Sequence, residues 1–146
     1  MFPRKYRIHA ILIVTFLFIV IYPQYSNKPD ENKTAAAKAA ALEFLQMVDA
    51  GQSENSWLIT AAYLRENVAL TAWQEKLVTM RTKSGPLVKR ELTDASFTAP
   101  IKDRPDSLAM VLTFDTEFQL QQDAEEKVTL LLDTEKGWQV VGYFIN

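Results

Sequence analysis

Few side chains in this chain could form a reactive site. Asp115 lies within an apolar stretch, and a carboxylate enclosed by apolar groups can act as a general base. A tyrosine beside it would supply a proton donor, and tryptophans at helical spacing could line a pocket. The candidate ligand-binding residues are therefore one carboxylate and four aromatic side chains: Trp57, Tyr63, Trp73, Asp115 and Tyr143.

Each candidate also has a purely structural explanation. Strand alternation places Asp115 with Thr113 and Glu117 on a solvated face, opposite the core. In that case Asp115→Asn changes stability by less than about 0.5 kcal/mol, as surface substitutions usually do. The tryptophans and tyrosines would then belong to the core and its edges.

Several kinds of chemistry are excluded by composition. The chain contains no cysteine and one histidine, His9, which rules out disulfides, thiolate chemistry and a Ser-His pair. The acidic pairs Asp103/Asp106 and Glu125/Glu126 are expected in exposed turns, without the spacing of a calcium loop. We expect no catalytic residue, metal or cofactor.

Charge argues against a nucleic-acid partner. Arg4, Lys5 and Arg7 precede the first acidic residue, Asp30, and the rest of the chain carries 13 basic against 18 acidic side chains. Nucleic-acid binding depends on clustered cations that release phosphate counterions. An acidic domain with scattered cations does not provide them.

The N-terminus predicts a membrane segment. From Ile8 to Tyr22 the sequence IHAILIVTFLFIVIY contains no charge, and it follows basic residues. A helix of this length is short for a bilayer core of about 30 Å, but flanking tyrosines can extend it into the interfaces. The following sequence, YPQYSNK, lacks the small residues of a signal-peptidase site, which favours an uncleaved signal anchor over a cleaved signal peptide.

These features divide the chain into four parts. We expect a cytoplasmic basic tail over residues 1–7, a transmembrane signal anchor over 8–25, a polar linker over 26–33 and an extracytoplasmic domain over 34–146. The domain is long enough for one core.

Three helices are expected first in the domain. The stripe of Ala37, Ala41, Phe44, Leu45 and Val48 predicts a helix from Thr34 that ends at Gly51. A second, less regular helix is expected over Ser53 to Val68. Thr71 and Gln74 resemble a capping box, which would open a third helix that ends at Ser84-Gly85-Pro86.

Four antiparallel strands are expected next. They cover Leu87 to Ala99, Leu108 to Phe118, Lys127 to Asp133 and Trp138 to Ile145, with a hairpin at Thr134 to Gly137 and a bulge at Gly142. Three helices on one face of a curved four-stranded antiparallel sheet define an α+β fold.

The order and the residues resemble the bacterial domain-of-unknown-function family 4019 over Ala35 to Asn146. The features that carry the resemblance are Phe44 to Gly51, Ser56-Trp57, Trp73, Gly85-Pro86-Leu87, Phe114-Asp115-Thr116, Phe118, Val128-Thr129-Leu130 and the ending Trp138 to Ile145. The family resembles cystatin-like and nuclear-transport-factor-like cones, which implies that fold but no catalytic residues. It also implies a bacterial protein. The anchor predicted from the N-terminal residues would then lie in the inner membrane with the domain in the periplasm, and the domain would be released there if the anchor is cleaved.

Two function classes remain open. The first is a non-catalytic envelope module that binds a protein, a peptide or a wall component. The second is a small-molecule-binding cone, with acid-base chemistry from Asp115 and a tyrosine. An apolar cavity lined by Trp57, Trp73 or Tyr143 with a carboxylate at its floor favours the second class, and a filled cone favours the first.

Overall fold

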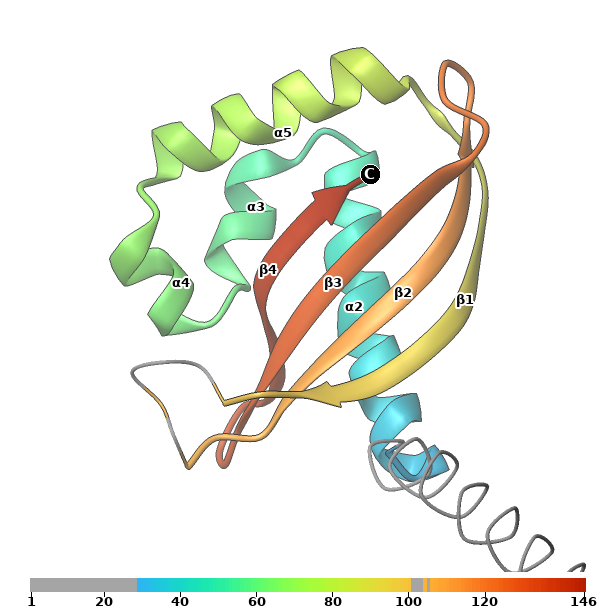
Figure 1. The fold of residues 1–146 in the computed structure, drawn as a ribbon. Helices are drawn as coiled ribbons and strands as arrows, with labels where there is room; N and C mark the ends of the chain where they lie inside the picture. The colour runs from blue at the N-terminus through green and yellow to red at the C-terminus, as the bar shows by residue number, and fades with distance from the viewer. Residues whose placement is uncertain (1–28, 101–103, 105) are drawn as a thin grey trace, which may run out of the picture.

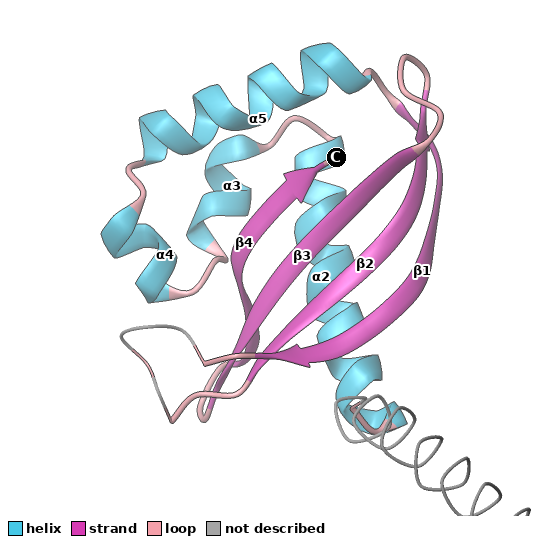
Figure 2. Ribbon diagram, in the orientation of Figure 1, coloured by secondary structure: helices cyan, strands magenta, loops and turns pink. Residues whose placement is uncertain are grey.

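The computed structural model describes residues 29–100, 104 and 106–146 as four helices followed by four strands. All four helices lie to one side of the sheet (Figures 1 and 2). This confirms an α+β fold with helices packed against an open antiparallel sheet. The predicted tail, signal anchor and first linker residues lie outside the described residues. Within the described part, no helix is long and apolar enough to cross a membrane.

Helix α2, Glu31–Asp49, is the longest element and packs along the sheet (Figure 1). It begins before the predicted Thr34, because the Asp30 carboxylate accepts a hydrogen bond from the Lys33 backbone N–H at 2.8 Å and caps the first turn. Residues 31–33 of the predicted linker are therefore helical. The helix buries the predicted stripe of Ala37, Ala41, Phe44, Leu45 and Val48. The chain leaves it through Gly51, whose φ is 73°.

The predicted second helix is two short helices, α3 (Ser53–Leu58) and α4 (Ala62–Asn67). The prediction of one continuous helix was wrong because the backbone N–H of Ala61 bonds to the carbonyl of Val140 in the sheet, at 2.8 Å. A donor used in this way cannot extend the helix. Thr60 closes the preceding turn, since its hydroxyl donates to the Trp57 carbonyl at 2.6 Å.

Helix α5, Leu70–Ser84, ends at Gly85 as predicted. The capping box was wrong: Ala69 is the N-cap, it has no side-chain cap, and its carbonyl already accepts the N–H of Trp73 at 3.0 Å. Thr71 therefore lies inside the helix. Gly85 has a φ of 76°, which favours glycine, and an added Cβ would lie 3.0 Å from Leu120 Cγ.

The sheet is a meander in the order β1-β2-β3-β4, with every neighbouring pair antiparallel. Its strands are β1 (Leu87–Thr98), β2 (Ala109–Phe118), β3 (Ala124–Asp133) and β4 (Gly137–Ile145). The predicted alternation in β2 is confirmed, because Leu112, Phe114 and Phe118 are buried. Strand β3 begins three residues earlier than predicted.

Three irregularities in strand pairing decide which side chains face the helices. The register of β1 against β2 shifts between Leu87 and Lys89 and again between Leu92 and Asp94. The register of β3 against β4 shifts between Thr129 and Leu130, which confirms the predicted bulge at Gly142. An extra residue reverses the alternation that follows it, so each bulge turns the subsequent side chains to the other face.

Aromatic side chains fill the space between the helices and the sheet. The Phe44 ring of α2 lies between Trp73 of α5 and Tyr143 of β4, with ring centroids 5.9 and 5.5 Å away. All three side chains are buried. Such tilted and edge-on contacts are favourable for aromatic rings. The region that the sequence offered as a pocket wall is therefore packed around Phe44.

Candidate functional site

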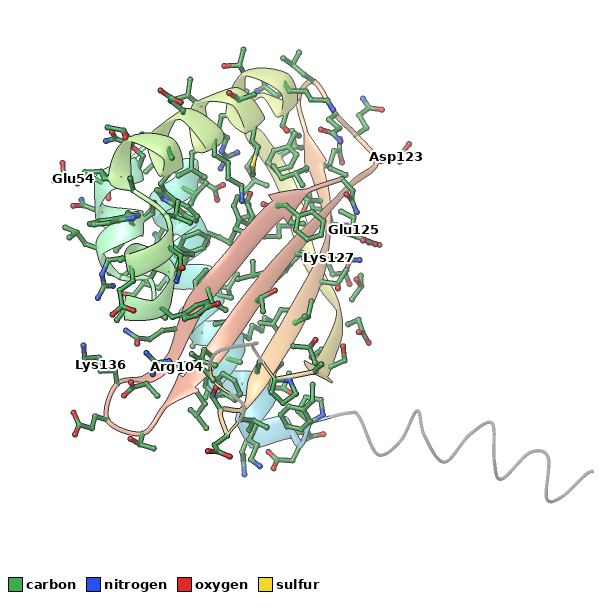
Figure 3. The ribbon with its side chains drawn as sticks, turned by 60° about the vertical axis from the view of Figure 1, so that its left-hand side comes forward. Glu54, Arg104, Asp123, Glu125, Lys127 and Lys136 are labelled. Carbon is green, nitrogen blue, oxygen red and sulfur yellow. The ribbon has the colours of Figure 1, made fainter. Side chains whose placement is uncertain are left out.

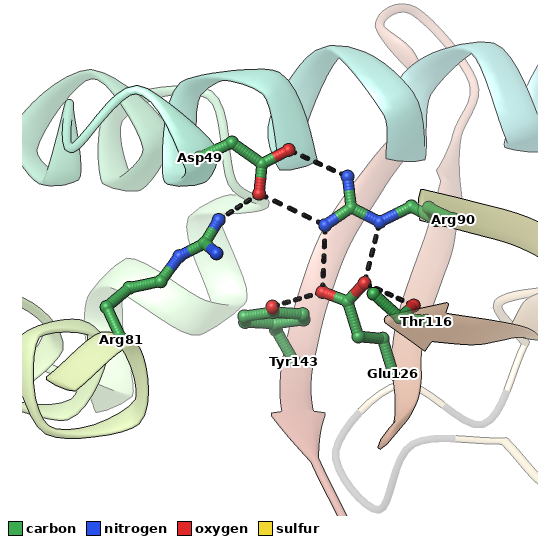
Figure 4. Close-up of polar contacts among 6 residues, drawn as sticks. All are labelled: Asp49, Arg81, Arg90, Thr116, Glu126 and Tyr143. Carbon is green, nitrogen blue, oxygen red and sulfur yellow. Dashed lines mark hydrogen bonds and ion pairs between the residues drawn. The ribbon is translucent and has the colours of Figure 1, made fainter. Parts of the chain in front are cut away.

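A cluster of six polar side chains connects the helices to the sheet. Figure 4 shows its members, which we call the polar cluster: Asp49, Arg81, Arg90, Thr116, Glu126 and Tyr143. They come from α2, α5 and all four strands. Two of the six are acidic and two are basic, so the ionised cluster is neutral.

Glu126 lies at the centre of the polar cluster and is completely buried. Its carboxylate accepts hydrogen bonds from Nε and Nη2 of Arg90, at 2.6 and 3.1 Å. It also accepts the Thr116 hydroxyl at 2.7 Å and the Tyr143 hydroxyl at 2.5 Å. A buried carboxylate is tolerated only when it is paired and hydrogen-bonded in this way.

Arg90 joins this centre to the end of α2. Its Nη1 and Nη2 atoms donate to the two carboxylate oxygens of Asp49 at 2.7 and 3.1 Å, in the bidentate arrangement that suits a guanidinium. Asp49 also pairs with Arg81 of α5, whose guanidinium lies 5.3 Å from the centroid of the Phe118 ring. Nε of Arg81 is buried and has no hydrogen-bond partner in the described part of the chain.

The bulges position two members of the polar cluster. In β4 the inward residues Trp138 and Val140 are two apart, but the next buried residue is Tyr143, because the bulge adds a residue between them. Without the bulge, Gly142 would face the helices. In β1 the first bulge likewise turns Arg90 inward, so that only 8% of its side chain is exposed.

Burial and charge shift the proton equilibria of two members. The pKa of Tyr143 is raised well above its ordinary value, because burial disfavours the phenolate and the Glu126 carboxylate repels it. Burial lowers the pKa of Arg81, and Arg90 adds to this, while Tyr143 and Glu126 act in the opposite direction. Tyr143 therefore remains a hydrogen-bond donor at neutral pH and does not act as a base.

The chemistry available to the polar cluster is limited by its own pairing. A general base must reach a substrate proton, and an acid must give one up near the working pH. The carboxylate of Glu126 already accepts from Arg90, Thr116 and Tyr143, and it has no exposed surface. The arrangement holds the helices to the sheet.

Asp115 and Tyr143 are not brought together. Asp115 is exposed on the outer face of β2, away from the helices, and Tyr143 is buried on the inner face of β4. Along the sheet, Asp115 lies directly between Glu91 of β1 and Glu125 of β3 in the strand register. We call these three carboxylates the acidic row. An open cleft of about 430 Å³ adjoins the acidic row and also includes Lys89.

The other aromatic candidates are separated as well. Trp73 is buried, and its indole N–H donates to the Ser56 hydroxyl at 3.1 Å. Trp57 is half-buried and donates to the Val68 carbonyl at 3.0 Å. Tyr63 lines an open cleft of about 440 Å³ near the β3-β4 hairpin, with Asp133 and Gln139. Trp57 and Trp73 satisfy their polar atoms within the helical layer.

Glu126 was predicted to lie in an exposed turn, but it is completely buried. The prediction was wrong because β3 begins at Ala124, and Glu126 then shares the inner face with Val128 and Leu130. A signal was available, since Glu126 lies two residues before Val128 in the strand period. Glu125 alternates to the outer face, where it pairs with Lys127 at 3.1 Å, and both project away from the helices (Figure 3).

Comparison with known proteins gives one family. A family model described as "Protein of unknown function (DUF4019)" matches residues 40–143, which include all six members of the polar cluster. A comparison with curated proteins finds no match.

Proposed function

We propose that this chain, which belongs to the DUF4019 family of proteins of unknown function, is a membrane-anchored extracytoplasmic module that binds a partner and catalyses no reaction. The observation that carries the proposal is the self-contained pairing of the buried charges. Glu126, the most deeply buried ionisable group that the structure describes, has no exposed surface and accepts four hydrogen bonds from the chain itself.

The filled interior supports the same conclusion. Cystatin-like and nuclear-transport-factor-like cones, which the chain resembles, include domains that enclose a ligand pocket and domains that bind through their surface. In this chain Phe44 occupies the space between Trp73 and Tyr143. A filled cone leaves its outer surfaces for recognition.

Anchoring outside the cytoplasm is the other part of the proposal. Arg4, Lys5 and Arg7 before the apolar segment favour a cytoplasmic N-terminus, and the acidic remainder of the chain would then lie in the periplasm. An enzymatic reporter that is active only outside the cytoplasm, fused after Asn146 of the full chain, should be active and should sediment with membranes. Activity of a cytoplasm-only reporter at the same position would contradict the topology, and release of the domain into the soluble periplasm would contradict the anchor.

Chemical labelling tests whether the interior is closed. We expect a water-soluble carbodiimide with an amine nucleophile to modify Glu125 in the native chain, because 41% of its side chain is exposed, and to leave Glu126 unmodified. Mass spectrometry of the peptide that contains both residues compares them directly, and urea-denatured protein shows that both can react. Modification of Glu126 in the native protein would instead favour the alternative function, a small-molecule-binding cone with a carboxylate and a tyrosine inside it.

A further inference from the structure

The two edges of the sheet differ in whether they are covered. At the β4 edge, the Ala61 backbone N–H donates to the Val140 carbonyl at 2.8 Å, so the α3-α4 connection covers part of it. Strand β1 pairs only with β2, and Figure 1 shows no described segment along its other side. An edge strand presents unpaired backbone groups that can bind another strand.

The bulges of β1 restrict where such pairing can occur. They divide β1 into two regular stretches, Asp94 to Thr98 after the second register shift and Lys89 to Leu92 between the two shifts. Apolar surface lies beside this stretch, because Val88 is 55% exposed and Leu42 of α2 is 40% exposed. These residues and Leu92 line a groove between α2 and β1. A lone edge lysine normally discourages pairing, but here Glu91 follows Lys89 by two residues on the same face.

We propose that β1 pairs antiparallel with β1 of a second copy of this chain, with Arg90 on the two-fold axis and Lys89 opposite Glu91 of the second copy. This surface goes beyond the proposed function, and it does not depend on it. The pairing would join two four-stranded sheets into one continuous sheet.

Within Lys89 to Leu92, the charges and the second bulge together select this register. A pairing centred on Leu92 would run into the register shift between Leu92 and Asp94 on both strands. The two β1 strands would be related by a two-fold axis. Outward-facing side chains of one strand lie opposite outward-facing side chains of the other only when one residue of each strand lies on that axis. With Lys89 on the axis, two Lys89 side chains would be opposite each other, and with Glu91 on the axis, two Glu91 side chains would be. Like charges directly opposite are destabilising. With Arg90 on the axis, both cross-strand pairs combine a lysine and a glutamate.

Two further features suit this register. Each Arg90 guanidinium is already neutralised by Asp49 and Glu126 and points into its own subunit, so the two arginines on the axis do not meet as free charges. The acidic row of Glu91, Asp115 and Glu125 ends at the β1 edge. Lys89 of the second copy would extend that row with a cation, and would offset the repulsion among its carboxylates.

Charge reversal with two differently tagged full chains in mild detergent tests the proposal. Wild-type chains should co-purify. Lys89→Glu or Glu91→Lys alone should weaken self-association by about tenfold or more, because each places like charges opposite one another in both symmetry-related pairs. A Lys89→Glu chain mixed with a Glu91→Lys chain should associate again, since both cross-strand pairs become complementary. The exposed substitutions Lys136→Glu and Glu54→Lys, away from β1, are the matched controls and should leave association unchanged.

Every other result overturns the proposal. A monomeric wild-type chain would do so. Association that both single variants retain would also do so, because it would show that the chains contact each other elsewhere, for example through the N-terminal segment. Failure of the mixed variants to associate would also overturn it. Recovery in the mixture can come only from folded chains, so it excludes misfolding as the cause of the single-variant losses.

Discussion

Replacing Glu126 with glutamine is the most direct test of the polar cluster. The substitution keeps the size of the side chain but removes its charge, and it puts an amide N–H₂ where Arg90, Thr116 and Tyr143 all donate. Breaking a buried ion pair by removing one partner costs about 3–5 kcal/mol, because the other charge remains buried. We expect Glu126→Gln to lower the free energy of unfolding by this amount.

The neighbouring residue provides the matched control. Glu125→Gln makes the same chemical change as Glu126→Gln. Glu125, however, pairs with Lys127 on the surface, where the two side chains are 41% and 36% exposed. Such a pair contributes about 0–1 kcal/mol, so Glu125→Gln should change stability by no more than that.

Urea unfolding, followed by the fluorescence of the three tryptophans, measures the difference. A small domain loses about 1–3 kcal/mol of stability per molar urea. The midpoint for Glu126→Gln should therefore lie roughly 2 M below that for Glu125→Gln, or the variant should fail to fold. A Glu126→Gln chain within about 1 kcal/mol of Glu125→Gln would refute the reasoning, because the cluster would then contribute little to stability.

Tyr143, Asp115 and Ser56 each give a further test. Tyr143 keeps its proton in the folded state above pH 10, whereas an unfolded tyrosine ionises there, so wild-type stability should fall by about 1.4 kcal/mol more than that of Tyr143→Phe between pH 9 and pH 11. Equal slopes in urea titrations would contradict the buried, protonated phenol. Asp115→Asn should leave the melting temperature unchanged or raise it, with the larger gain at low salt, because it relieves repulsion in the acidic row. A loss above 1 kcal/mol would contradict its exposed position. Ser56→Ala should destabilise by about 1–3 kcal/mol, because it leaves the Trp73 indole N–H buried and unpaired. The same urea assay measures it, and a neutral result would mean that the indole finds another acceptor.

Periodicity predicted much of this fold because the faces of α2 and β2 that pack against each other are largely apolar. The stripe on α2 and the alternation in β2 needed no information beyond the spacing of side chains. The break between α3 and α4 could not be predicted in that way. It depends on a hydrogen bond from Ala61 to Val140, which lies far along the chain.

The polar cluster was harder to predict for a related reason. Its four charged members look like ordinary surface residues when each is considered alone, and their burial depends on partners from other elements. Arg90 and Tyr143 face inward only because bulges shift the alternation of β1 and β4. Glu126 was predictable from its spacing to Val128, but an acidic side chain is expected inside only when its partner is known.

The long chain separations within the polar cluster bear on the order in which the domain assembles. Asp49 and Arg90 are 41 residues apart, and Arg90 and Glu126 are 36 apart. Closing such loops costs entropy that is recovered only when several elements are already in place, whereas the β2-β3 and β3-β4 hairpins are local. We expect the cluster to form after the folding transition state, so that its loss accelerates unfolding and hardly changes the refolding rate. The buried charges would then determine how long a folded molecule persists, and the hairpin turns how quickly it forms.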